Sequence, residues 1–327
     1  MRKEQFKETV NNYTNKGIPF LFIADFNLTN LQVIKLDSLK ENAVFYAFAE
    51  EITASKNDFT NVDFNFKITL PKPKTYTKKF NDVKKELQNG NTYLLNLTCK
   101  NKIKFKDPKV TLQAIYENTK AKYKLLYKDK FVCFSPETFI KITNNTIRTF
   151  PMKGTIDATI KDAANKLLNN KKESREHNTI VDLLRNDLAI VATDIKVEKF
   201  KYLDKIETQN GAILQMSSEI SGKLPKNWQS HFGDILLKLL PAGSVTGAPK
   251  QKTVEIIKKT ENYNRDFYTG VFGVFDGKNI DSAVLIRFIE KENDGFYYKS
   301  GGGITYLSDL KTEYNELKQK VYLPITE

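Results

Sequence analysis

The order of strand-like and helix-like segments is the feature that most constrains the fold of this chain. At 123–150 short apolar runs (YKLLY, KFVCF, TFIKI and TIRTF) alternate with polar turns, which predicts a meander of short strands. From about 157 to 190 the apolar residues recur at helical spacing instead. The stripes are Ile160, Ala163, Ala164, Leu167 and Leu168, then Ile180, Val181, Leu184 and Leu188. Blocks of strands and helices without strict alternation predict a large α+β fold built on antiparallel sheets.

Further elements are expected on both sides of this region. Strand-like runs cover 19–26, 43–52, 62–70, 92–100, 270–276, 282–291 and 295–300, and helical patterns cover about 76–89, 248–261 and about 309–321. The stretch PKPKTYTKK at 71–79 has two prolines and alternating lysines, and we expect it to be an exposed connector. No repeat or low-complexity linker divides the chain, so residues 1–327 are expected to form a single domain.

Composition excludes several classes of protein. No apolar run approaches the roughly 20 residues that cross a bilayer, and no secretory signal is visible. Cys99 and Cys133 are too few for a disulfide framework or a structural zinc site. We therefore predict a cytoplasmic protein. The net charge of +13 fits either a polyanionic partner such as nucleic acid or a lysine-rich solvated surface, and the spread of the lysines favours the second.

Two pairs of glutamates share one spacing. Glu173 and Glu176 lie at the start of a predicted helix, and Glu313 and Glu316 lie in the last one, with Lys320 on the same face. A spacing of three places both carboxylates of a pair on one helix face. Four carboxylates from two helices form a set of hard oxygen ligands suited to Mg²⁺. The alternative is that each pair lies on an ordinary solvated helix.

Two glycine-containing stretches suggest a ligand near the main chain. LLPAGSVTGAPK at 239–250 precedes a predicted helix, whose free N–H groups can bind an anion. Its spacing is not that of a P-loop, because Ala-Pro-Lys follows the second glycine, so nucleotide binding is rejected. SGGGI at 300–304 follows a strand-like run. It suits either close approach of the main chain to a ligand or a loose hairpin end.

The stretch TFPMKGT at 149–155 places Lys153 in a turn at the end of a strand-like run. Glu137, in SPETF at 135–139, lies sixteen residues earlier, with two strands and one turn between. A hairpin can therefore bring the two side chains near each other. A carboxyl and an amine that face one cavity form an acid–nucleophile pair. The alternatives are a solvated lysine and a surface ion pair.

The order of these motifs resembles that of the chorismate-utilising enzymes. The motifs are SPETF, PMKGT, EHNTIVDLLRNDL, PAGSVTGAPK, YTGVFGVFDG, IRF, GGGI and EYNELKQK. Within that family the chain is most similar to component I of the aminodeoxychorismate synthases, the aminating subunits of para-aminobenzoate and folate biosynthesis. The resemblance covers about residues 90–327, and residues 1–75 match only loosely. It implies a two-layer antiparallel β core flanked by helices, with the site between the layers.

The resemblance also implies roles for individual residues. Mg²⁺ would hold the ring carboxylate of chorismate, with Glu176 and Glu316 as direct ligands and Glu173 and Glu313 completing the shell. The groups that correspond to the carboxylate-binding residues of the family are Tyr268, Arg287, Lys320 and the backbone of Gly301, Gly302 and Gly303. Thr155 and Thr246 would line the pocket. Gln215 stands where many relatives have histidine; it can hydrogen-bond a leaving hydroxyl but cannot carry a proton.

Residue 153 indicates which reaction the resemblance implies. Relatives that form anthranilate or salicylate typically have alanine there, whereas aminodeoxychorismate synthases commonly have lysine. Lys153 would add at ring carbon 2 while the 4-hydroxyl leaves, and ammonia would then add at carbon 4 and expel the lysine. Glu137 would act first as acid and then as base. Anthranilate synthase component I is the alternative, and a basic nucleic-acid-binding protein is an alternative of another class.

The implied reaction needs a source of ammonia. Glutamine amidotransferases use a cysteine on a sharp glycine-flanked turn together with histidine and glutamate, and neither Cys99 nor Cys133 has that setting. We therefore expect a separate glutaminase subunit to supply ammonia. Because the sequence ends at Glu327 without an appended lyase, the product is expected to be aminodeoxychorismate, which a separate downstream lyase would consume. No nucleic-acid or membrane partner is expected.

Overall fold

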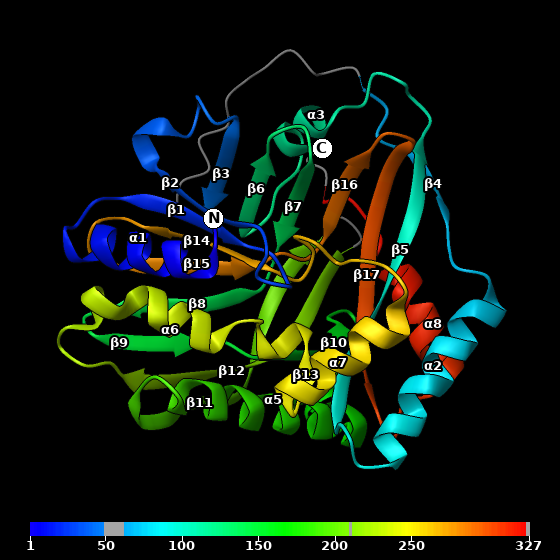
Figure 1. Cartoon of the computed structure of the whole chain (residues 1–327). Coiled ribbons are helices and arrows are strands. Elements are labelled where there is room, and N and C mark those ends of the chain that lie inside the picture. The colour runs from blue at the N-terminus through cyan, green and yellow to red at the C-terminus, as the bar shows by residue number, and fades with distance from the viewer. Residues whose placement is uncertain (49–61, 209–210, 325–327) are drawn as a thin grey trace.

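The computed structural model describes residues 1–48, 62–208 and 211–324. It contains two antiparallel sheets whose strands run steeply across one another, with helices along the outside (Figure 1). The predicted α+β class and the antiparallel core flanked by helices are therefore confirmed. No helix in the described ranges is both long enough and apolar enough to cross a bilayer.

The two sheets interleave segments that are distant in sequence. The nine-stranded sheet has the order β10 (Met152–Asp157), β12 (Gly211–Lys223), β9 (Thr146–Thr149), β8 (Thr138–Thr143), β15 (Ile280–Val284), β14 (Val271–Phe275), β1 (Phe20–Ala24) and β2 (Leu31–Lys35), and β11 (Thr193–Thr208) also pairs with β12. The eight-stranded sheet has the order β13 (Gly247–Ala248), β5 (Leu94–Phe105), β17 (Gly295–Thr305), β16 (Phe288–Glu292), β7 (Phe131–Ser135), β6 (Tyr123–Tyr127) and β3 (Val44–Phe48), and β4 (Phe66–Thr69) also pairs with β5.

The helices divide between the two sheets. They are α1 (Lys3–Asn15), α2 (Pro73–Gln88), α3 (Leu112–Glu117), α4 (Ala163–Leu168), α5 (Lys171–Ala189), α6 (Phe232–Leu239), α7 (Lys250–Glu261) and α8 (Leu310–Gln319). Helix α5 packs on β10 and β12 of the first sheet, whereas α8 packs on β17 of the second. The two helices that carry the predicted glutamate pairs therefore belong to different layers.

Strand β1 shows how the core is layered. Its five residues, FLFIA, are all buried, because successive side chains of a strand point to opposite faces and both faces are covered. Phe20, Phe22 and Ala24 pack in a cluster with residues of α5 and α6. Leu21 and Ile23 pack instead with residues of β6 and β7 from the second sheet. The first sheet therefore has helices on one face and the second sheet on the other.

One predicted connector and one predicted helical residue are wrong. The stretch 71–79 is not an exposed connector, because Pro73 begins α2 and Tyr76 is buried against the second sheet. Proline at the first helical position costs no hydrogen bond, so it starts a helix rather than preventing one. The two predicted helical stripes at 157–190 correspond to α4 and α5, but Ile160 lies outside both helices and is exposed.

Three predicted strand arrangements are also wrong. The region 123–150 is not one meander but two hairpins, β6–β7 and β8–β9, in different sheets. The run 282–291 is likewise two strands, β15 and β16, and Arg287 between them has a positive φ of 51°. The glycines of SGGGI lie within β17 rather than after it. Apolar runs in strands buried on both faces do not reveal where the chain changes sheet.

Candidate functional site

Lys153 lies at an irregularity in the pairing of β10 with β12. The register shifts between Met152 and Thr155, and Gly154 within that interval has a φ of +84°. A β-bulge of this kind re-aims a side chain out of the regular alternation. Gln215 on β12 stabilises the bulge, because its Nε2 donates to the Gly154 carbonyl oxygen at 2.9 Å. The Gln215 amide therefore helps to hold the segment that carries Lys153.

The bulge directs the lysine toward the glycines of the second sheet. A Cβ built on Gly303 would lie 3.3 Å from the Lys153 Nζ. A Cβ on the preceding residue, Gly302, would lie 3.4 Å from the Glu316 Oε1 and 3.6 Å from the Lys320 Nζ. Because glycine has no side chain, Gly302 and Gly303 leave space where Lys153 of the first sheet approaches α8, which packs on the second sheet. The glycines lie within a paired strand and not at a loose hairpin end, and the close approach of a ligand to them stays a prediction.

Two of the glycines, Gly301 and Gly302, are expected to respond differently to substitution by alanine. A Cβ on Gly301 would lie 2.4 Å from the backbone oxygen of Leu97, whereas the atoms nearest a Cβ on Gly302 are side-chain ends at 3.4–3.6 Å. We expect Gly301→Ala to lower the free energy of unfolding by about 1–3 kcal/mol. Gly302→Ala should leave it almost unchanged, and urea denaturation measures both. Equal losses in the two variants would contradict this account of the strand.

The four predicted glutamates lie around this space together with lysines. Glu173 Oε2 lies 3.1 Å from the position of a Cβ on Gly154. The Lys172 Nζ bridges the two helices, at 3.9 Å from the Glu176 Oε1 and 3.5 Å from the Glu313 Oε1. Glu313 is only 3% exposed. The structure thus brings both pairs to one site, with a lysine between them that the sequence analysis did not single out.

Burial raises the pKa of these carboxyl groups, whereas the charges of nearby lysines lower it. Burial raises the pKa of the Glu176 carboxyl, despite the nearby charges of Lys153 and Lys172. Burial, and then the neighbouring Glu316, raise the pKa of Glu313. Burial would also raise the pKa of Glu316, but the Lys320 ammonium, 2.5 Å from its Oε1, outweighs this and the pKa falls. The site therefore gathers carboxylates whose charge is balanced in part by Lys172 and Lys320.

The donor set suits a divalent cation chemically. Carboxylate oxygens are the ligands that Mg²⁺ prefers, and the Glu176 Oε1 is buried with no hydrogen-bond partner in the described chain. In this conformation no three Asp, Glu, His or Cys side chains among the described residues converge closely enough to hold a metal ion. Lys172 and Lys320 instead contact the carboxylates. The residues fit Mg²⁺ by chemistry, and its binding stays a prediction.

Glu137 lies between the two sheets, just before β8. Ser244 donates a short hydrogen bond to its Oε1. Burial raises the pKa of the Glu137 carboxyl, although the Ser244 hydrogen bond and the charges of Lys153, Arg287 and Lys320 act in the opposite direction. A raised pKa favours the protonated carboxyl, which is the form a general acid needs. The acid–nucleophile pair predicted for Glu137 and Lys153 thus has both groups within electrostatic reach.

The remaining predicted residues differ in what they offer to a ligand. The Arg287 Nε is buried without a hydrogen-bond partner in the described chain, and the Lys320 Nζ donates to the Gly301 carbonyl oxygen at 3.0 Å. Thr246 is buried and its hydroxyl already donates to the Ala242 carbonyl oxygen at 2.7 Å. Thr155 is exposed on β10. Tyr268 is 3% exposed, within the apolar layer between the sheets.

Several functional neighbours had no signal in the sequence. His177, next to Glu176, is fully buried, and its Nε2 lies 2.6 Å from the Ser218 hydroxyl on β12. Burial lowers the pKa of this imidazole to about 4, so a neutral ring joins α5 to the first sheet at physiological pH. Ser244 and Arg265 form contacts with partners more than a hundred residues away. Spacing in the sequence carries no information about such contacts.

The chain is similar to known proteins over most of its length. The model of the chorismate binding enzyme family matches residues 24–326. An uncharacterized PabA-like protein of Haemophilus influenzae is 49% identical over 326 residues, 98% of this chain and 97% of that protein. Aminodeoxychorismate synthase component 1 of Salmonella typhimurium is 31% identical over 259 residues, which are 75% of this chain but only 56% of the relative.

Solved structures give the same fold. The menaquinone-specific isochorismate synthase from Escherichia coli superimposes with a TM-score of 0.72, covering 97% of this chain and 80% of that one. At 16% identity this likeness concerns the fold alone. The relatives found by sequence share a larger fraction of identical residues with this chain, and the family model spans nearly the whole chain. The chain therefore belongs to the chorismate binding enzyme family.

Proposed function

We propose that this chain aminates chorismate with ammonia to give 4-amino-4-deoxychorismate, as the resemblance to aminodeoxychorismate synthases implies. The observation that carries the proposal is the placement of the Lys153 amine, which lies 3.3 Å from the Cβ position of Gly303, between the sheets and among the glutamates. The relation to aminodeoxychorismate synthase component 1 supports the choice of reaction. This chain spans 56% of that relative's length.

The proposed reaction divides one hindered displacement into two steps. The neutral Lys153 amine adds at ring carbon 2, the two ring double bonds shift, and the 4-hydroxyl leaves as water with a proton from Glu137. Ammonia then adds at carbon 4, the double bonds shift back, and the lysine amine leaves carbon 2. The Glu137 carboxylate takes the surplus proton from the new amino group. The balance is chorismate plus ammonia giving product plus water.

The side chains around the glycines would hold the substrate. Chorismate carries two carboxylates, and Arg287 and Lys320 offer them cationic donors. The unpartnered Arg287 Nε is available for this contact. Glu173, Glu176, Glu313 and Glu316 would hold Mg²⁺, which neutralises carboxylate charge and acts as a Lewis acid when bound.

Mg²⁺ is expected to stabilise the free protein. A cation that binds only the folded chain adds about 2.7 kcal/mol to its stability at 100 times the dissociation constant. The melting temperature should therefore rise with Mg²⁺ and return to its starting value with EDTA. Glu176→Gln should abolish most of the shift, whereas Glu255→Gln, at a half-exposed ion pair on α7, should keep it. A shift of the same size in both variants would contradict the assigned ligands.

Ammonia is proposed to come from a separate glutaminase subunit. Both cysteines are buried, and burial raises the pKa of the Cys99 thiol to about 12. A thiol held in its neutral form is a poor nucleophile, which supports the view that glutamine is hydrolysed elsewhere. Free ammonium at high pH should replace the partner. Glutamine hydrolysis by this chain alone would disprove the need for one.

A product assay tests the proposed function directly. The purified chain is incubated with chorismate, Mg²⁺ and ammonium near pH 9, and the products are resolved by chromatography and mass. We expect aminodeoxychorismate, which an added lyase converts to para-aminobenzoate. Anthranilate, which is fluorescent and forms without a second enzyme, would keep the family but replace the proposed reaction. No turnover, with EDTA making no difference, would contradict the site assignment as a whole.

A further inference from the structure

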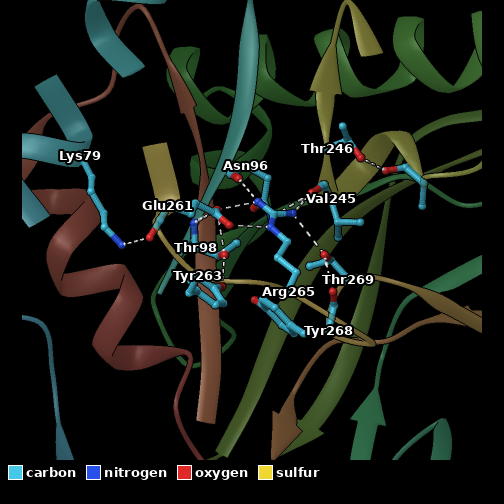
Figure 2. Close-up of polar contacts among 11 residues, drawn as sticks. Lys79, Asn96, Thr98, Val245, Thr246, Glu261, Tyr263, Arg265, Tyr268 and Thr269 are labelled. Carbon is cyan, nitrogen blue, oxygen red and sulfur yellow. Dashed lines mark hydrogen bonds and ion pairs between the residues drawn. The ribbon is translucent and has the colours of Figure 1, made fainter. Parts of the chain in front are cut away.

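We infer that Arg265 is a positioning residue that fixes three substrate-facing segments relative to one another. The inference rests on the chorismate site of the proposed function. Arg265 lies four residues beyond the end of α7, in the loop that leads to β14. Its side chain is 1% exposed, so it cannot itself contact chorismate. Figure 2 shows it at the centre of contacts that come from several parts of the chain.

All five N–H donors of the Arg265 guanidinium have acceptors. Nε and one Nη2 donor bind the two carboxylate oxygens of Glu261 at 2.8 and 2.7 Å. The other Nη2 donor binds the Asn96 carbonyl oxygen at 2.6 Å. The Nη1 donors bind the Val245 carbonyl oxygen at 2.9 Å and the Thr269 hydroxyl at 3.1 Å. A planar fork with every donor occupied permits only one arrangement of these partners.

Each partner adjoins a group proposed to face the substrate. Asn96 on β5 pairs with Gly303, and its N–H donates to the Thr246 carbonyl oxygen at 2.9 Å. Val245 directly precedes Thr246. Thr269 directly follows Tyr268, and its hydroxyl donates to the Tyr268 carbonyl oxygen at 2.6 Å. The guanidinium therefore joins β5, the 3₁₀ turn η3 (Gly243–Val245) and the loop before β14.

The Glu261 carboxylate extends the same network to the strand beside the glycines. Its Oε1 also accepts from the Thr98 N–H at 2.7 Å and from the Thr98 hydroxyl at 2.8 Å. Thr98 pairs with Gly301. Both charges of the pair are buried, and the desolvation of two such charges offsets most of their attraction. The benefit of the pair therefore lies mainly in geometry rather than in net stability.

The double variant Glu261→Gln/Arg265→Met tests whether the pair positions the three segments or only stabilises the folded protein. It removes both charges together, so no unpaired charge is left buried, and the introduced amide can still accept from Thr98. Hydrogen exchange is measured by mass spectrometry on the full chain, and chorismate affinity by calorimetry with Mg²⁺. We expect at least tenfold faster exchange at 94–98, 243–248 and 266–270, unchanged exchange at 131–135, and at least tenfold weaker chorismate binding.

Two further variants complete the test. Thr269→Val keeps shape and removes one Arg265 contact, and should weaken binding by a few-fold even if the double variant does not fold. Ile115→Ala, in a separate apolar cluster, should lower stability without changing chorismate affinity. Unchanged affinity in Thr269→Val and in a folded double variant would overturn the inference, as would equal acceleration of exchange throughout the chain. If wild type bound no chorismate, the proposed function would fail, and the exchange pattern would still decide the role of Arg265.

Discussion

Lys153→Ala is expected to lower aminodeoxychorismate formation by on the order of a thousandfold or more, because loss of a covalent nucleophile in other enzymes costs up to about a millionfold. Among the described residues, the lysines that contact the glutamates, Lys172 and Lys320, are themselves paired with carboxylates and should not replace the amine. Chorismate binding should persist, because Arg287 and Lys320 remain. Steady-state rates with saturating ammonium, together with calorimetric chorismate affinity, measure the two effects separately.

Lys153→Arg is the matched variant for this prediction. Arginine keeps the positive charge beside the glutamates, but its guanidinium stays protonated and cannot add to the ring. If the lysine acts as a nucleophile, both variants are inactive, and wild type without ammonia gains the mass of chorismate minus water, which peptide mapping locates on Lys153. Activity retained in Lys153→Arg would assign the lysine an electrostatic role. An adduct on another lysine would contradict the assignment of the nucleophile.

The fold class could be predicted from the sequence because hydrophobic periodicity reports local burial. The apolar stripe of Ile180, Val181, Leu184 and Leu188 lies on a helix and is buried as predicted. Periodicity cannot show which sheet a strand joins. The strand-like run at 282–291 therefore concealed the crossing at Arg287, where the chain leaves the first sheet for the second. That crossing brings Arg287 to the region between the sheets.

The sequence predicts those parts of the candidate site whose residues lie close together in the chain. A spacing of three places Glu313 and Glu316 on one face of α8, and the glycine run indicates a close approach at Gly302. The sequence could not indicate Ser244 beside Glu137, because 107 residues separate them. The Glu261–Arg265 pair has helical spacing, but Arg265 lies beyond the end of α7. Tertiary contacts alone give these residues their partners.

Glu137→Gln is expected to slow formation of the Lys153 adduct by about 10²–10⁴-fold, the usual contribution of a positioned general acid. The amide keeps the shape and can still accept from Ser244, but it has no proton for the leaving hydroxyl. Burial raises the pKa of the Glu137 carboxyl, so the wild-type rate should fall as the pH rises through that pKa. This limb of the profile should be missing in the variant. Single-turnover mass spectrometry without ammonia measures the rate of adduct formation at each pH.

The raised pKa of Glu137 also determines how the stability of the protein depends on pH. A group whose pKa is higher in the folded state than in the unfolded state stabilises the protein at low pH. This contribution is fully present below the unfolded-state pKa, which is about 4.3 for glutamate. It is lost as the pH rises through the folded-state pKa. Glu137→Gln removes this titration, so the variant should lose less stability than wild type between acid and neutral pH. Urea denaturation at several pH values measures the difference.

Ser244→Ala gives the matched test of the general acid, because it keeps the carboxyl and removes the hydrogen bond that lowers its pKa. The pKa of Glu137 should rise further, and the falling limb of the adduct rate should move to higher pH while the rate below it stays close to wild type. A limb that moves to lower pH would show that another group titrates. An adduct rate in Glu137→Gln equal to that of wild type would show that the leaving hydroxyl takes its proton from elsewhere. Either result would remove Glu137 from the proposed chemistry, while leaving the test of Lys153 intact.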